Sequence, residues 1–336
     1  MAGKSFFFFF DRKTLMAVSK GMNKTKTLLS LFSAVSFVAT SASGELLVYE
    51  GFDYGAAGEP LDAYTSVGTE PVGLAGTGTG QWTDADSATH DSYLKSGSLS
   101  FSNLATSGNH IGYENNNQSD RYNRGLETTG FSSGSIYFSF LFEKLQSNFG
   151  ADREGFAVMN QVAPQARWDS GNSGAIGLEG FAVAAVDGSN LQAVGYDGTS
   201  GTRTVSGGSV PITVVNGGSN TSISNVAVNF IVGEISFNTG TGGADVFSLY
   251  NFADDGSLDT SALDSNSDAT LIDTIEFDMD ESTLNTLNLT RQVNVNYDEV
   301  RIGTTLGDVL VPVPEASTFT LLGLSGLFLL RRRRRS

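Results

Sequence analysis

The chain has no cysteine and only two histidines, His90 and His110, among its 336 residues. Without cysteine there is no disulfide framework and no thiol chemistry, so the hydrophobic core must hold the fold. A zinc site of three or four ligands is difficult to assemble from two separated histidines. Only six prolines occur, which argues against a proline-rich stalk. Convincing helical periodicity is also absent, so these absences favour a β-rich domain stabilised by its core alone.

Basic residues are scarce in the central part of the chain. Eleven of the twenty Lys and Arg residues lie before residue 27 or in the last six residues, so nine remain, whereas thirty-five of the thirty-six acidic residues follow residue 27. Phosphate backbones require positive charge, so nucleic acid is excluded as a partner. Strong acidity fits solubility outside a cell, cation binding, or repulsion from other polyanions.

The N-terminus predicts export through the secretion translocon. Residues 22–43 combine a basic start at Lys24 and Lys26, an apolar run over 28–39 and small residues up to the cleavage site near Ala42. The preceding residues 1–21 contain five consecutive phenylalanines, which neither a signal peptide nor a folded domain needs. We expect Met22 to be the true start, and a genuine longer basic region is the alternative.

The C-terminus, residues 312–336, has three parts. A polar start is followed by an apolar segment, 316–330, of fifteen residues, and then by an arginine block. At ~1.5 Å per residue this predicted helix spans about 22 Å, less than the ~30 Å of a bilayer core. Arginines beside an apolar segment stay on the cytoplasmic side, so the bulk of the chain is expected on the other side. The residues assigned to the sorting signal are Val313, Pro314, Glu315, Arg331, Arg332, Arg333, Arg334 and Arg335.

This tail resembles the PEP-CTERM signal of Gram-negative bacteria, in which Val-Pro-Glu-Pro precedes a Leu/Gly-rich helix and an Arg-rich end. One position departs, because Ala316 replaces the second proline. The resemblance implies an exosortase, a membrane cysteine protease, as partner. It also implies an inner-membrane stage before processing, then a cell-surface or extracellular-matrix location in an organism that makes extracellular polysaccharide. An ordinary tail anchor with a stop-transfer charge cluster is the alternative.

The central residues 44–311 predict one all-β domain, because alternating and β-branched segments recur between turns rich in Gly, Asn, Asp and Ser. On one segment, Val226, Val228, Phe230 and Val232 alternate with Asn225, Ala227, Asn229 and Ile231, which predicts a single buried face. The strands expected are 46–49, 98–104, 135–142, 155–160, 176–186, 192–196, 210–215, 226–237, 245–251, 271–279 and 293–302.

Four short blocks are similar to exported PEP-CTERM proteins with a laminin-G/concanavalin-like domain. That resemblance implies an antiparallel jelly-roll sandwich in which the first and last strands meet. The fold it implies does not fix a ligand. The blocks are Tyr49–Tyr54, Ser135–Leu141, Gly243–Tyr250 and Asp298–Thr305.

Candidate catalytic residues lie in the acidic stretch 276–281. On a strand, Glu276, Asp278 and Asp280 share one face, and paired carboxylates are what a retaining glycosidase uses. The spacing resembles the catalytic strand of laminarinases, which would make Glu276 the nucleophile, Asp278 a helper and Glu281 the acid/base for a β-glucan. However, Asp280 stands where that motif has an apolar residue, and the chain has only two tryptophans to line sugar subsites. We therefore predict a non-catalytic domain, with the glycoside hydrolase as the alternative.

Two further kinds of site are candidates. Asp254, Asp255 and Asp259 form an oxygen-rich turn that could hold Ca²⁺, although such residues also stabilise their own turns. Tyr113, Tyr122 and Trp168 lie in polar segments and are the predicted contacts for a polysaccharide, since glycan sites use exposed aromatic rings flanked by polar groups. We therefore predict either no cofactor or calcium.

Overall fold

The computed structural model describes the β-domain with gaps, and the predicted signal peptide and the sorting signal with its helix 316–330 lie outside the described residues. No helix within the described part of the chain is long and apolar enough to cross a membrane. The described residues are 44–64, 71–75, 82–84, 92–104, 106–112, 120–127, 131, 134–144, 155–160, 177–187, 190–198, 203–205, 210–211, 228–256, 258–291 and 295–310.

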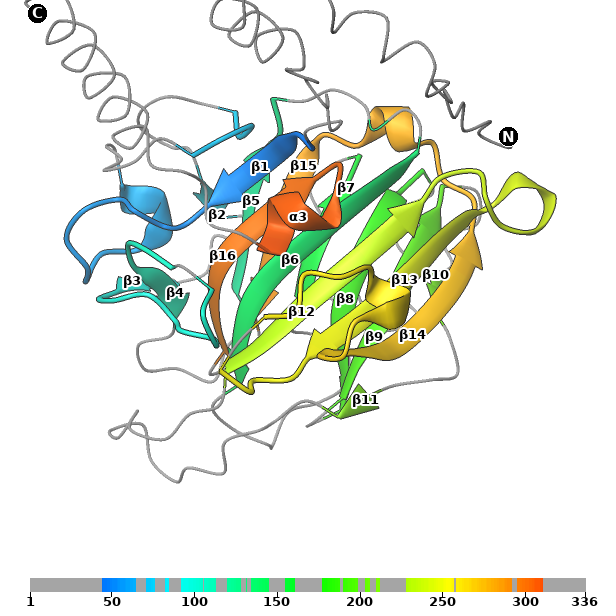
Figure 1. The fold of residues 1–336 in the computed structure, drawn as a ribbon. Coiled ribbons are helices and arrows are strands. Elements are labelled where there is room, and N and C mark those ends of the chain that lie inside the picture. Colours follow the sequence, from blue (N-terminus) through cyan, green and yellow to red (C-terminus); the bar gives the residue numbers. More distant parts are fainter. Residues whose placement is uncertain are drawn as a thin grey trace, which may run out of the picture. The chain divides into compact units, whose positions relative to one another are not determined.

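Two antiparallel sheets of eight strands form a β-sandwich, which confirms the predicted all-β antiparallel class (Figure 1). Sheet I has the order β14 (Ala269–Phe277), β13 (Asp245–Phe252), β12 (Val228–Ser236), β6 (Ser135–Lys144), β16 (Val295–Gly303), β4 (His110–Gly112) and β3 (Tyr93–Lys95), with β1 (Leu46–Glu50) also paired to β16. Sheet II has the order β10 (Arg203–Val205), β9 (Asn190–Asp197), β8 (Glu179–Asp187), β7 (Gly155–Met159), β15 (Thr286–Arg291), β5 (Asp120–Gly125) and β2 (Thr83–Asp84), with β11 (Val210–Pro211) paired to β9.

The first and last strands meet, as the family resemblance implied. Leu46 pairs with Gly303 and Glu50 with Val300 in the antiparallel β1–β16 pair. The short helix α3 (Leu306–Leu310) follows β16 and packs over β6 and β16 on one face of sheet I (Figure 1).

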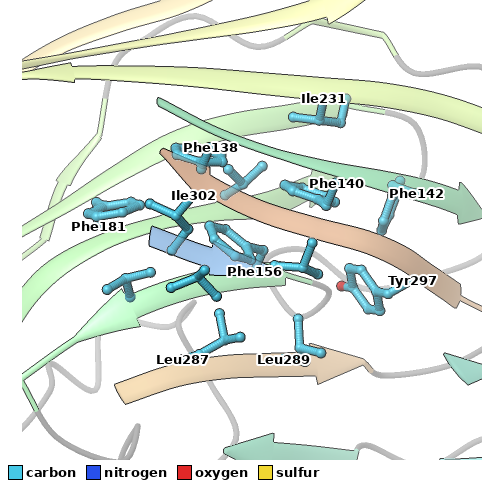
Figure 2. Packing of buried hydrophobic residues seen from close by; sticks show 14 of the residues in the cluster. Phe138, Phe140, Phe142, Phe156, Phe181, Ile231, Leu287, Leu289, Tyr297 and Ile302 are labelled. Carbon is cyan, nitrogen blue, oxygen red and sulfur yellow. The ribbon is translucent and has the colours of Figure 1, made fainter. Parts of the chain in front are cut away.

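The main core fills the space between the sheets with aromatic rings from alternate positions of β6. The ring centroid of Phe138 lies 4.9 Å from that of Phe156 and 5.4 Å from that of Phe181, which both come from sheet II. Phe140 packs on Phe156 at 5.1 Å. Figure 2 shows these rings meeting between the two layers, and burial of large aromatic surfaces is the main stabilising contribution in such a core.

A second apolar cluster covers part of the outer face of sheet I. Because of it, two predictions are wrong: the single buried face of the strand at 226–232 and the strand at 98–104. Phe230 and Val232 of β12 face this cluster, while Ile231 faces the main core, so both faces of this strand are buried instead of one. The segment 98–104 is not a strand. Its apolar residues Leu99, Phe101 and Leu104 are buried on the sheet, where the Phe101 ring lies 5.4 Å from that of Phe230. Helix α3 completes this cover through Val309 and Leu310.

Candidate functional site

The acidic stretch 276–281 lies at the end of β14, the outermost strand of sheet I. Phe277 and Met279 are buried, whereas Glu276, Asp278 and Asp280 are exposed, so the predicted division into two faces is confirmed. The core side anchors the strand and leaves the carboxylates facing solvent.

Two of these carboxylates are engaged by nearby turns. The Glu276 Oε2 atom accepts a hydrogen bond of 3.1 Å from the backbone N–H of Thr241. Asp280 is the N-cap of the short 3-10 helix η5 (Glu281–Thr283), where its Oδ1 atom accepts from the N–H of Ser282 at 3.1 Å. The Glu276 and Asp280 carboxylates therefore stabilise turns, and no described hydrogen bond joins Glu276 to Glu281.

Two of the predicted calcium residues accept hydrogen bonds from the protein, Asp254 from a distant segment and Asp259 from its own loop. Asp254 accepts from the N–H and hydroxyl of Ser102 at 3.1 and 2.7 Å. Asp259 accepts from the backbone N–H groups of Ser261 and Ser267 at 2.9 and 3.0 Å, and these donors lower its pKa to about 2. Each donor occupies a lone pair that a cation would otherwise need, and Asp259 receives four such hydrogen bonds from Ser261 and Ser267. Among the described residues, no three His, Cys, Asp or Glu side chains form a group that could hold a metal.

The predicted glycan contact Tyr122 is wrong, because it is a core residue. It lies on β5, inside the main core, and only 1% of its surface is exposed. The polar composition of 120–125 hides this strand. Tyr122 packs in the main core, and Arg124 donates a hydrogen bond to the buried Glu50. Tyr113 and Trp168 lie outside the described residues.

Asp120 and Met159, described residues close to the segments that carry Tyr113 and Trp168, pair with opposite ends of β15. Arg291, the last residue of β15, pairs with Asp120, which directly follows the 113–119 segment. Thr286, the first residue of β15, pairs with Met159, which lies shortly before the 161–176 segment. Six strand residues span roughly 17 Å, so the structure does not bring the two anchor points together.

Sequence reasoning missed a buried ion pair that joins the two sheets. The Arg124 Nη1 atom of β5 lies 3.1 Å from the Glu50 Oε2 atom of β1, and both side chains are 2% exposed or less. The Tyr54 hydroxyl donates to Glu50 and accepts from Arg124 at 2.6 Å and from the Trp82 indole N–H at 2.9 Å. The available sequence indication was the mixture of charged and aromatic residues in the two segments 49–54 and 120–125.

A second polar network lies on the outer face of sheet I, at a bulge in β16. Glu299 has a left-handed backbone with φ of 52°, an uncommon conformation for a non-glycine residue, and its carboxylate receives Arg301 at 2.7 Å. Asp298 accepts from the N–H of Leu99 at 2.8 Å, and Glu299 from the N–H of Ser107 at 2.9 Å. The bulge thereby fastens the 98–107 segment onto the sheet, which gives the Asp298–Thr305 block a structural role.

Buried carboxyl groups predict greater stability in mild acid than at neutral pH. Burial raises the pKa of Glu50, Glu143 and Asp298, and the charge of Glu299 raises that of Asp298 further. A carboxyl with a higher pKa in the folded chain contributes stability below its ordinary pKa of about 4, and this is lost as the pH rises through the raised value. Asp259 acts in the opposite direction, but only as the pH falls below its ordinary value of 3.8 toward about 2.

We expect the thermal unfolding midpoint to decrease from about pH 4 to pH 7, and Asp298→Asn to reduce this slope. Scanning calorimetry across this range measures the effect. Asp254→Asn, at an exposed carboxylate that also accepts hydrogen bonds, is the matched control. A midpoint that rises over the same range in the unmodified protein would contradict the assignment.

No family model matches the sequence, and no curated protein matches it. Solved two-sheet β-structures are similar at low identity. The globular domain of T. cruzi calreticulin covers 68% of this chain and 86% of its own, with 10% identity and a TM-score of 0.41. The metal-free exoplasmic/lumenal domain of VIP36 covers 72% and 90%, with 9% identity and a TM-score of 0.39. Peanut lectin bound to a 9mer peptide covers 76% and 97%, with 11% identity and a TM-score of 0.36. These low values transfer no ligand, metal or activity to this chain.

Proposed function

We propose that this chain is an exported, exosortase-sorted protein whose non-catalytic β-sandwich acts at the cell surface or in the extracellular matrix, where it binds polysaccharide. The observation that carries the proposal is the order of parts in the C-terminal tail: Pro314-Glu315, a short apolar segment, and five terminal arginines. The signal peptide expected at 22–43 requires the same route.

The β-domain supports the proposal by its composition and its architecture. It contains no cysteine, so it needs no oxidative folding step after export, and its core and buried ion pairs supply the cohesion that disulfides would. Its acidity disfavours binding to nucleic acid, because both carry negative charge. The described carboxylates at 276–281 stabilise turns, which fits a binding role better than a catalytic one.

Deletion of residues 314–336 is expected to release the domain into the medium, because it removes both the apolar segment and the arginines that hold it. Fractionation of producing cells followed by immunoblotting measures the shift from the membrane fraction. The paired substitution Pro314→Ala/Glu315→Ala, which keeps the apolar segment, is expected to hold the protein unprocessed in the membrane. Processing of this variant equal to that of the unmodified protein would contradict recognition at Pro314-Glu315, and no processing of either protein would identify a simple tail anchor. An unchanged distribution of the deletion variant would contradict the proposal.

A further inference from the structure

The outer face of sheet I has a covered part and an open part. The second apolar cluster buries Phe230, Val232 and Phe252, but farther along the same strands the outward-facing side chains are half-buried or exposed. We call this open part the platform. Its residues are Ser135, Tyr137, Glu234, Ser236, Ser248, Tyr250, Thr274 and Glu276.

Strand register places the platform residues in rows. Tyr137 of β6 is opposite Glu234 of β12, which is opposite Ser248 of β13, which is in turn opposite Thr274 of β14. The side chains bond along this row, since the Tyr137 hydroxyl donates to Glu234 Oε1 at 2.9 Å and the Ser248 and Thr274 hydroxyls lie 3.2 Å apart. The platform is thus a preorganised, hydroxyl-rich surface four strands wide.

Two tyrosines lie on either side of the Glu234 carboxylate. Tyr137 is opposite Glu234 on β6, and on β13 Tyr250 lies two residues from Ser248, which is also opposite Glu234. Burial, and then the negative charge of Glu234, raise the pKa of both phenols. Both rings are partly packed against the second apolar cluster. Packing restricts the rings, so little conformational entropy is lost when a ligand stacks on them.

Charge and chemistry select the class of ligand. The platform residues include two carboxylates and no lysine, arginine or histidine, so an anionic polymer would be repelled. Fixed aromatic rings offer an apolar surface to the C–H face of a sugar ring, and the surrounding hydroxyl and carboxylate oxygens match its hydroxyl groups.

We propose that the platform binds a neutral polysaccharide, with Tyr137 and Tyr250 packing on sugar rings and Glu234 accepting hydrogen bonds from sugar hydroxyls. This inference rests on the proposed polysaccharide-binding function. It adds the location of the site and the charge class of the polymer.

The test measures binding of the full-length chain, purified in mild detergent, to immobilised neutral glucans (laminarin, mixed-linkage β-glucan and amylose) and to alginate as the anionic probe. We expect binding to at least one neutral probe and none to alginate. Tyr250→Ala is expected to weaken neutral binding about tenfold. Thr274→Lys, at an exposed position that tolerates substitution, is expected to weaken it as well by blocking the row. Tyr93→Ala, at a half-buried tyrosine on β3 at the other end of the strand order, is the matched control and should bind normally.

Each other result overturns a defined part of the proposal. Unchanged binding by Tyr250→Ala and Thr274→Lys would place polysaccharide binding elsewhere and dispose of the platform alone. Failure of the unmodified chain to bind any neutral probe would overturn both the platform and the polysaccharide role, while the fractionation experiment tests sorting independently. Equal binding to alginate would refute the neutral class. Self-association that Tyr250→Ala abolishes, without glycan binding, would identify a second copy of the chain as the occupant.

Discussion

Replacement of Arg124 with leucine is expected to reduce the free energy of unfolding by about 3–5 kcal/mol, the usual cost of removing one partner of a buried ion pair. The substitution leaves the Glu50 carboxylate in the interior without its counter-charge. It also removes the donor that lies 2.6 Å from the Tyr54 hydroxyl and the guanidinium that lies 6.0 Å from the Trp82 ring. Urea unfolding followed by tryptophan fluorescence measures the loss.

The double variant Glu50→Leu/Arg124→Leu is the matched comparison. Because it buries no unpaired charge, it is expected to be more stable than the single Arg124→Leu variant. A single variant that loses less than about 1 kcal/mol, as exposed pairs do, would show that Glu50 reaches water in solution.

Substitution of Phe138 by alanine is expected to cost about 3–5 kcal/mol, because it opens a cavity in the centre of the main core. The Phe138 ring contacts Phe156, Phe181 and Phe247, with centroids 4.9, 5.4 and 5.7 Å away. The adjacent strand provides room for the ring through Gly233, where an added Cβ atom would lie 2.1 Å from the ring carbons. The Phe138 ring therefore fits only because residue 233 is a glycine.

A double-mutant cycle tests this dependence. Gly233→Ala alone is expected to destabilise the protein through overpacking, whereas Phe138→Leu/Gly233→Ala should be more stable than the sum of the two single changes predicts. Free energies that add within about 0.5 kcal/mol would show that the two positions do not share this space.

Strands with strong apolar patterns were predictable from the sequence, whereas polar strands were not. The apolar run 136–142 and the alternation of Phe277 and Met279 with acidic residues correspond to β6 and β14 as expected. Strand β5 was missed because its charged residues are compensated by partners distant in the chain. Strand β15 was missed although Leu287 and Leu289 alternate with Thr and Asn, a pattern that could have identified it.

The candidate platform could not be predicted from sequence because its residues are brought together by register. Tyr137, Glu234, Ser248 and Thr274 come from four strands, and a shift of one residue in any pair would turn a side chain to the other face. The acidic stretch 276–281 stands out in the sequence because it is contiguous, yet its described contacts stabilise turns. The candidate platform is therefore a property of strand register, which composition does not encode.

The position of β16 has a consequence for the timing of folding. It is the last strand that the structure describes, and it pairs with β6, β1 and β4 in the interior of sheet I. The sheet cannot close until nearly the whole chain is available, and such non-local pairing folds slowly. A chain threaded from its N-terminus would thus expose β1 long before its partner arrived. In the export that we propose, this strand order would keep sheet I from closing until nearly the whole chain had crossed the membrane.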